Sequence, residues 1–204
     1  MSIDHKAYLF RYYEFRRELA DLLYHALETG EISPLREFIN RNRSSLTAED
    51  AADPHLPAEE PNVQRYADLA LTKYYDPVNE GLSYGYDALH AYLGTVPALD
   101  GQVDRLICGN LFGPEGKRLD PGYMGTGLLS PNEVQRLATL LSNAEYPSIP
   151  DPGSRIYADC LYQPESADEV QESLEMLKEL YGRAVRSTSG LLLMDFSDLS
   201  VSNL

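Results

Sequence analysis

The chain has 204 residues, a formal net charge of −15 and 43% hydrophobic residues. This length favours one domain over two, and the hydrophobic content supports a packed core and excludes disorder throughout. No apolar run approaches the roughly eighteen residues of a membrane span, and the polar stretch 1–7 does not resemble a secretion signal. We therefore expect a cytoplasmic protein that does not span a membrane.

The two cysteines, Cys108 and Cys160, lie far apart in apolar surroundings. They are expected to be buried thiols outside any disulfide, which fits a reducing compartment. The four histidines are dispersed, and neither residue type shows the spacing of metal ligands. No metal and no cofactor is expected.

The charge is unevenly distributed. Residues 1–43 hold seven basic and seven acidic side chains, whereas residues 44–204 hold ten basic and twenty-five acidic ones. Binding of nucleic acid through its phosphates needs a basic footprint, which only the arginines of 1–43 could supply, so we do not expect it. Those arginines would more simply face the acidic remainder, within the fold or across a homo-oligomer. The acidic excess serves solubility or offers a surface to a basic partner protein.

The N-terminal part predicts helices. Apolar residues recur at helical spacing from Phe15 to Ala26, which predicts one helix ending near Gly30. Ser33 followed by Pro34 predicts the N-cap and first turn of a second helix. Residues 1–43 are thus expected to form an N-terminal helical element, and the proline-rich stretch 48–62 a surface loop.

The middle of the chain is less clear. Val63–Tyr75 fits either a strand or a helix. Residues 81–94 predict a short helix with Tyr86 and Leu89 on its apolar face, and Leu106–Cys108 predicts a short buried strand.

Two capping sequences mark the last third. Ser130-Pro131-Asn132-Glu133 and Ser166-Ala167-Asp168-Glu169 both predict helix starts, and Leu191–Met194 predicts a closing buried strand. Helices outnumber strands and do not alternate with them regularly. The expected fold class is α+β: one helix-rich domain with a small sheet.

Several short motifs occur in the order found in the YfbM-like family of bacterial proteins of unknown function. They are Leu71-Thr72-Lys73-Tyr74, the run from Tyr86 to Gly94 with Leu89-His90 at its centre, Cys108-Gly109-Asn110, Gly122-Tyr123-Met124-Gly125, Leu129–Val134 and Leu177-x-x-Leu180-Tyr181-x-x-Ala184. On these motifs residues 65–196 resemble that family, and the N-terminal helical element lies outside the resemblance. The resemblance implies an α+β fold and no particular reaction.

No standard catalytic motif is present, because the glycine-rich stretch lacks a phosphate-loop ending and no nucleophile elbow occurs. The residues best suited to form a ligand pocket are Tyr74, Tyr86, His90, Arg118, Asp120 and Tyr123. A histidine in a pocket can transfer protons near neutral pH, and Arg118 adds local positive charge to a glycine-rich turn. The alternatives are a histidine at the edge of the core, bonded to backbone, and an ordinary irregular connection.

Two functions follow from these observations. The first is a non-catalytic protein-interaction module, of immunity or inhibitor type, that binds a basic protein through an acidic, tyrosine-rich surface. The second is a small-molecule-binding protein or enzyme with a Tyr/His/Asp pocket. Whether the protein is an enzyme stays open, with the first function favoured.

Overall fold

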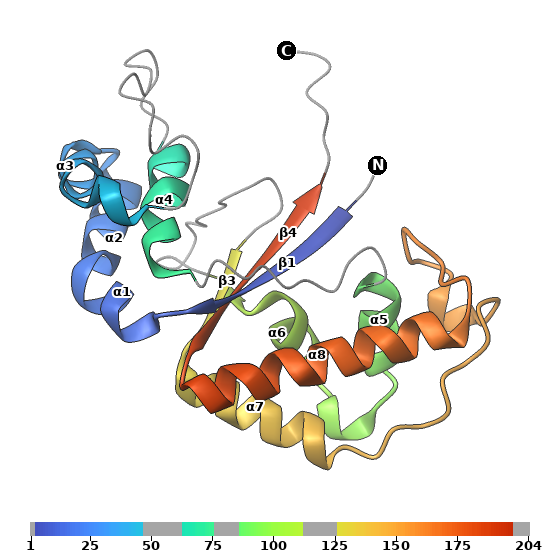
Figure 1. The fold of residues 1–204 in the computed structure, drawn as a ribbon. Coiled ribbons are helices and arrows are strands. Elements are labelled where there is room, and N and C mark those ends of the chain that lie inside the picture. Colours follow the sequence, from blue (N-terminus) through green and yellow to red (C-terminus); the bar gives the residue numbers. More distant parts are fainter. Residues whose placement is uncertain (1–2, 47–62, 76–85, 112–125, 198–204) are drawn as a thin grey trace, which may run out of the picture.

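The computed structural model describes residues 3–46, 63–75, 86–111 and 126–197. These residues form a four-stranded antiparallel sheet in the order β1-β4-β3-β2, with helices on both of its faces (Figure 1). The strands are β1 (Ile3–Phe10), β2 (Asn110–Leu111), β3 (Thr126–Leu129) and β4 (Gly190–Ser197). The predicted α+β class, helix-rich with a small sheet, is confirmed.

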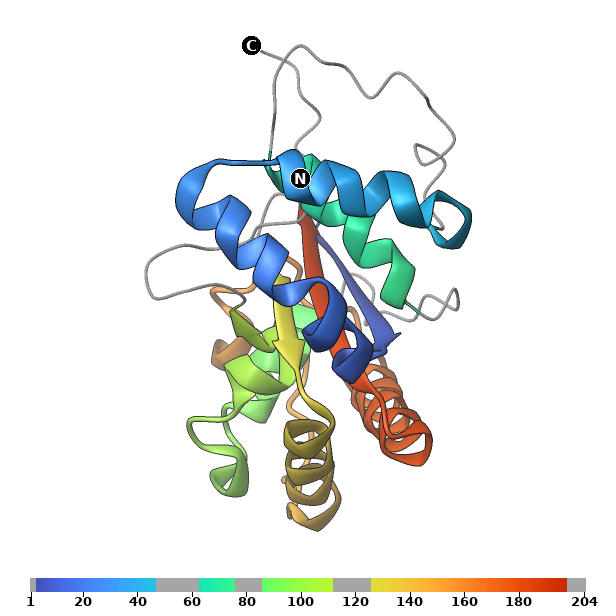
Figure 2. The ribbon, with the colours of Figure 1, turned by 90° about the vertical axis from the view of Figure 1, so that its left-hand side faces the viewer.

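The α-helices fall into two sets on either side of the sheet (Figures 1 and 2). One set is α1 (Tyr12–Glu18), α2 (Ala20–Thr29), α3 (Ser33–Asn42) and α4 (Val63–Leu71). The other is α5 (Tyr86–Leu93), α6 (Val103–Cys108), α7 (Pro131–Asn143) and α8 (Ala167–Ser187). Short 3-10 turns cover Arg43–Ser45, Thr72–Tyr74, Pro97–Leu99 and Arg155–Tyr157. We call α1–α4 the N-terminal layer and α5–α8, with their connections, the C-terminal layer.

The first and last described strands lie side by side. β1 pairs with β4 along its whole length, from Ile3 opposite Ser197 to Phe10 opposite Gly190. The sequence predicted a purely helical N-terminal element. This prediction is wrong for Ile3–Phe10, which form β1 of the sheet. The polar residues His5 and Lys6 obscure the strand pattern in the sequence.

The sheet separates two hydrophobic cores, and its strands contribute side chains to both. On β4, Leu192 packs with the N-terminal layer, whereas Leu191 and Leu193 pack with the C-terminal layer. β3 divides in the same way, with Leu128 on the N-terminal side and Leu129 on the other. Alternate side chains of a strand point to opposite faces, so a strand covered on both faces is apolar without interruption. Burial on both faces explains the unbroken run of leucines. The strand predicted at Leu191–Met194 is confirmed as part of β4.

Two further expectations need correction. The helix expected up to Gly30 is interrupted at Leu19, where α1 ends and α2 begins in a new direction, although it does end at Gly30 in a left-handed conformation (φ 74°). Leu106–Cys108 is not a strand but the end of α6, because Val103, Leu106 and Ile107 are buried at helical spacing. The alternative left open at Val63–Tyr75 is decided in favour of helix.

One glycine allows a close contact between the sheet and the C-terminal layer. A Cβ at Gly127 on β3 would lie 1.5 Å from the carbonyl oxygen of Cys108, at the end of α6. Only glycine allows β3 and α6 to approach this closely.

Candidate functional site

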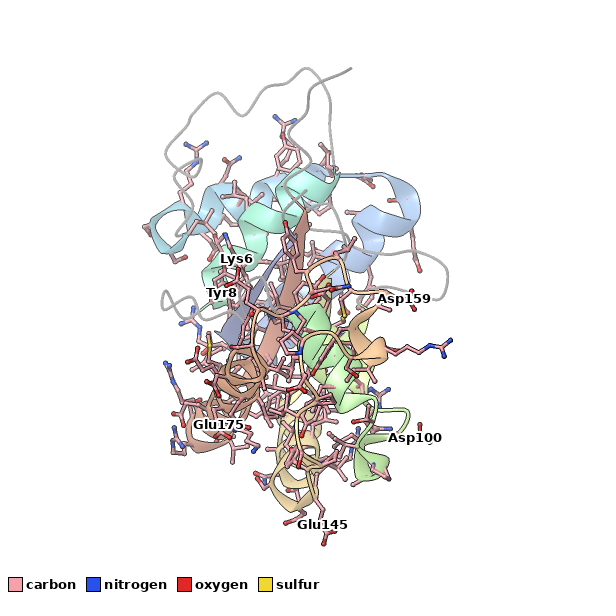
Figure 3. All side chains as sticks on the ribbon, turned by 90° about the vertical axis from the view of Figure 1, so that its right-hand side faces the viewer. Lys6, Tyr8, Asp100, Glu145, Asp159 and Glu175 are labelled. Carbon is pink, nitrogen blue, oxygen red and sulfur yellow. The ribbon has the colours of Figure 1, made fainter. Side chains whose placement is uncertain are left out.

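The acidic excess of the described residues lies on one side of the sheet. The C-terminal layer, within residues 86–111 and 126–187, carries thirteen acidic and six basic side chains. The N-terminal layer, within 11–46 and 63–75, carries seven acidic and eight basic ones. Four of the exposed acidic residues are labelled in Figure 3, spread over the C-terminal layer: Asp100, Glu145, Asp159 and Glu175. The C-terminal layer thus presents a negative surface and the N-terminal layer does not.

The longest helix, α8, carries the densest part of this surface. Asp168, Glu172, Glu175 and Glu179 are all exposed and follow one another at intervals of three or four residues, so they form a stripe along one side of the helix. The opposite side of α8 is buried against the core. Ser166 caps the helix by accepting a hydrogen bond from the backbone N–H of Glu169, and acidic residues in the first turn suit the helix dipole.

Half of the stripe is paired with cations. The carboxylate of Glu175 lies 3.4 Å from the ammonium of Lys178, and that of Glu179 lies 2.7 Å from the guanidinium of Arg186. Asp168 and Glu172 form no ion pair with any described residue. Two carboxylates of the stripe, both in the first half of α8, are therefore without a cation.

The predicted pocket residues are only partly brought together. Tyr74 is buried in the core of the N-terminal layer, whereas Tyr86 and His90 lie on α5 in the C-terminal layer. The sheet separates them, so Tyr74 cannot share a pocket with the other two. Arg118, Asp120 and Tyr123 lie outside the described residues.

His90 forms a pair with a carboxylate that the sequence did not indicate. Its Nε2 atom lies 2.7 Å from a carboxylate oxygen of Asp104, fourteen residues further along the chain on α6. The His90 side chain is 41% exposed and that of Asp104 93%, so the pair faces solvent. A carboxylate beside an imidazole can orient its ring, which is one requirement of a general base.

A second histidine of this corner is buried. The Nε2 atom of His5 lies 2.7 Å from the carbonyl oxygen of Ile107, and its ring centroid lies 5.5 Å from that of Tyr86. His5 thereby connects β1 to α6 and α5 across the core. The arrangement anticipated for His90, a core histidine bonded to backbone, is the one that His5 adopts.

Three tyrosines of the C-terminal layer are part of its core. Tyr92, Tyr157 and Tyr181 are fully buried, and the hydroxyls of Tyr92 and Tyr181 donate to the backbone carbonyls of Pro147 and Leu106. Burial raises the pKa of Tyr181, and burial together with Tyr92 and Glu175 raises the pKa of Tyr146 to about 12. The buried rings of Tyr92, Tyr157 and Tyr181 therefore stabilise the core, and the half-buried Tyr86, Tyr146 and Tyr162 are the described tyrosines of this layer that reach its surface.

The strongest charge cluster lies on the opposite layer. The ammonium of Lys73, only 17% exposed, donates to the carboxylate of Glu18 at 2.7 Å and to the side-chain oxygen of Asn42 at 2.9 Å. The hydroxyl of Tyr74 donates to the same carboxylate at 3.3 Å. The hydrogen bond from Lys73 leads the interactions that lower the pKa of Glu18 to about 2. Burial raises the pKa of Tyr74, and the charge of Glu18 raises it further.

Because Lys73 and Glu18 are paired with each other, the cluster joins α1, α3 and the turn after α4 and does not form an open site. Sequence reasoning missed it since Glu18 and Lys73 are 55 residues apart. The ammonium of Lys73 also lies 5.1 Å from the ring centroid of Phe38.

Among the described residues, no group of three or more His, Cys, Asp or Glu side chains is arranged to hold a metal ion. Cys108 and Cys160 carry thiols and no disulfide, and both are half-buried where full burial was expected. Within the described ranges, none of the helices combines the length and apolar character needed to cross a membrane.

Comparison with known proteins finds no similar family model, curated protein or solved structure.

Proposed function

We propose that the protein is a non-catalytic interaction module that binds a basic partner protein through its C-terminal layer. The observation that carries the proposal is the one-sided charge: thirteen acidic against six basic side chains on that layer, and a near balance on the other. The concentration of acidic side chains on one layer gives the molecule a negative face.

A negative face acts on a basic partner before contact. Complementary potentials raise the association rate, and the effect weakens as salt shortens the screening length. The first half of α8 adds a contact point, since Met176 is exposed between Glu172 and Glu179. A methionine surrounded by carboxylates suits a partner whose surface combines apolar and basic side chains. We propose that the protein acts as an immunity protein or inhibitor that binds a basic enzyme.

The test compares two triple variants of equal charge change. Glu172→Gln/Glu175→Gln/Glu179→Gln removes three charges from α8, and Asp21→Asn/Glu31→Gln/Glu37→Gln removes three exposed charges from the N-terminal layer. A partner captured by the wild-type protein is purified, and its association rate is measured from about 50 to about 500 mM salt. The α8 variant should slow association at least tenfold at low salt, and the control should not. An association rate independent of salt, or equal effects of both variants, would refute the proposal.

A second candidate, a small-molecule-binding protein or enzyme, is favoured by one observation, the 2.7 Å contact between His90 and Asp104. A ligand held at this pair should stabilise the wild-type protein in a thermal-shift screen of metabolites, and it should not stabilise His90→Gln. If every stabilising compound acts equally on both proteins, the pair is not a binding site.

We also propose, from the motifs in residues 65–196, that this part of the chain belongs to the YfbM-like family and that the protein acts in the cytoplasm. A solved structure of a family member should then contain α5–α8 and β4 in the same order. A member with a different strand order would exclude the relationship.

A further inference from the structure

Three large apolar side chains are exposed among the described residues: Tyr13, Leu161 and Met176. Tyr13, which is 58% exposed, belongs to α1 in the N-terminal layer. Met176, which is 46% exposed, belongs to α8 in the C-terminal layer. Exposed aromatic and methionine side chains are favoured at the centres of protein interfaces. The charges around these two residues have opposite sign.

Positive charge surrounds Tyr13. Arg16 and Arg17 follow it at three and four residues in the same helix, so they lie beside it on the surface of α1. The guanidinium of Arg17 lies 2.8 Å from Glu18, but that carboxylate also faces Lys73, so two cations share one anion. Arg16 forms no ion pair with a described residue and lies 5.9 Å from the ring centroid of Tyr24. This end of α1 carries an excess of two positive charges.

Negative charge surrounds Met176. Glu172 precedes it by one helical turn, and Asp168 precedes Glu172 by another. Neither carboxylate is paired within the described part of the chain, whereas Glu175 and Glu179 each have a cation. Asp168 and Glu172 thus place two unpaired negative charges on the side of α8 that carries its exposed apolar side chain.

The two surfaces match in charge but cannot meet within one molecule. α1 lies at the left of Figure 1 and the first half of α8 at the right, on opposite sides of the sheet. We propose that they meet between molecules: Tyr13, Arg16 and Arg17 of one copy dock on Asp168, Glu172 and Met176 of the next. This inference rests on the proposed function, since it assigns a second copy of the chain as a basic partner of the same acidic surface.

Such a contact is head-to-tail, because it joins two different surfaces of the same chain. Head-to-tail contacts form closed rings when the rotation between neighbours closes and open chains when it does not. Since the contact depends on few apolar atoms and on exposed charges, self-association should be concentration-dependent and should weaken with salt.

The test reverses each surface in turn. Sedimentation velocity at about 50 mM salt, where screening is weak, should detect self-association of the full-length wild-type protein at high concentration. Arg16→Glu/Arg17→Glu makes both surfaces acidic, and Asp168→Lys/Glu172→Lys makes both basic, so each variant alone should be monomeric. An equimolar mixture should associate again, because every contact in it joins opposite charges. Arg36→Glu/Arg41→Glu on α3 is the matched control and should associate as the wild type does.

If a charge reversal prevents folding, neutral variants replace it: Arg16→Gln/Arg17→Gln and Asp168→Asn/Glu172→Gln. Each should reduce the association constant at least fivefold. A wild type that stays monomeric at every concentration overturns the inference, as does a mixture that does not associate. A monomeric wild type whose α8 variants still lose a captured basic partner would reject self-association alone and leave the proposed function standing. Self-association that requires both surfaces would support this inference. If no other basic partner is then captured, the proposed function is narrowed to the binding of a second copy of the chain.

Discussion

The two helix layers pack against one sheet, but different kinds of interaction hold them. In the C-terminal layer, α7 and α8 begin at serines whose hydroxyls accept hydrogen bonds from the third backbone N–H of the helix. In the N-terminal layer, α1, α2 and α3 begin without a side-chain cap. The starts of α7 and α8 are thus encoded by adjacent residues, whereas α1, α2 and α3 depend more on contacts with distant parts of the chain.

Those distant contacts are aromatic and ionic. Phe10 and Phe15 pack their rings 5.3 Å apart between centroids, and the ring of Tyr74 lies 5.9 Å from that of Phe15. Lys73 then joins Glu18 to Asn42 beside these rings. The charges of Lys73 and Glu18 therefore hold the N-terminal layer together, whereas the exposed carboxylates of Asp168 and Glu172 on α8 form no such link among the described residues. This difference leaves the C-terminal surface available for binding.

The largest effects should come from two neighbouring leucines of β4 that separate the layers. Leu192→Ala opens the N-terminal core and Leu193→Ala opens the C-terminal core, since both side chains are buried. Each change should lower the free energy of unfolding by about 3 kcal/mol, the usual range for leucine cavities being roughly 2–5 kcal/mol. Urea unfolding followed by circular dichroism measures both.

Because the two cores share the sheet, each variant should still unfold in a single transition with an unchanged m value. The exposed residue Leu161 is the control, and Leu161→Ala should change stability by no more than about 0.5 kcal/mol. Two separate transitions in Leu192→Ala would show that the N-terminal layer is an independent unit, contrary to the single domain expected from the sequence.

Removal of the Lys73 charge should have the next largest effect. Lys73→Met keeps the length of the side chain but leaves the carboxylate of Glu18 beside aromatic rings without its ammonium. A partly buried pair lies between exposed pairs and fully buried ones, so the loss should be about 2 kcal/mol. Arg186→Met breaks an exposed pair on α8 and should cost no more than about 0.5 kcal/mol. Equal losses in the two variants would contradict the contrast between the layers.

The same pair predicts a dependence on pH. The hydrogen bond from Lys73 is the largest contribution to lowering the pKa of Glu18 from the ordinary 4.5 to about 2. A carboxyl with a lowered pKa in the folded state stabilises it fully above the unfolded value and loses this effect as the pH falls through the folded value. Stability should thus fall between pH 4.5 and about 2, and less so in Lys73→Met. Parallel acid profiles of the two proteins would exclude this role for Glu18.

The parts of the fold that the sequence predicted are those encoded locally. Ser130 and Ser166 identify the starts of α7 and α8, and the unbroken leucines of β4 identify a strand buried on both faces. β1 was missed because its pairing with β4 involves the far end of the chain. The three apolar residues at the end of α6 were misassigned since so short a run fits both strand and helix.

The candidate site shows the same limit. The unequal charge of the chain was visible in the sequence, but its separation by the sheet depends on which helices cover which face. The sequence singled out His90 and could not supply Asp104, because a pair on two helices needs their packing. It also placed Tyr74 with His90, although the sheet lies between them. Residue type therefore identified His90 as a candidate site residue, but only the tertiary packing shows which residues contact it.

The smallest predicted effect compares the two serine caps of the C-terminal layer. Ser130 accepts from the backbone N–H of Glu133, whose carboxylate in turn accepts from the backbone N–H of Ser130 and from the side chain of Asn110 on β2. At Ser166 the second half of this box is replaced, since the carboxylate of Glu169 accepts from the backbone N–H of Glu165. Ser130→Ala should therefore cost about 1.5 kcal/mol and Ser166→Ala about 1 kcal/mol. Urea unfolding again gives both values, and Ser142→Ala, an exposed serine inside α7, is the control that should change little. A larger loss at Ser166 would show that the reciprocal bond and the link to Asn110 do not add stability at the start of α7.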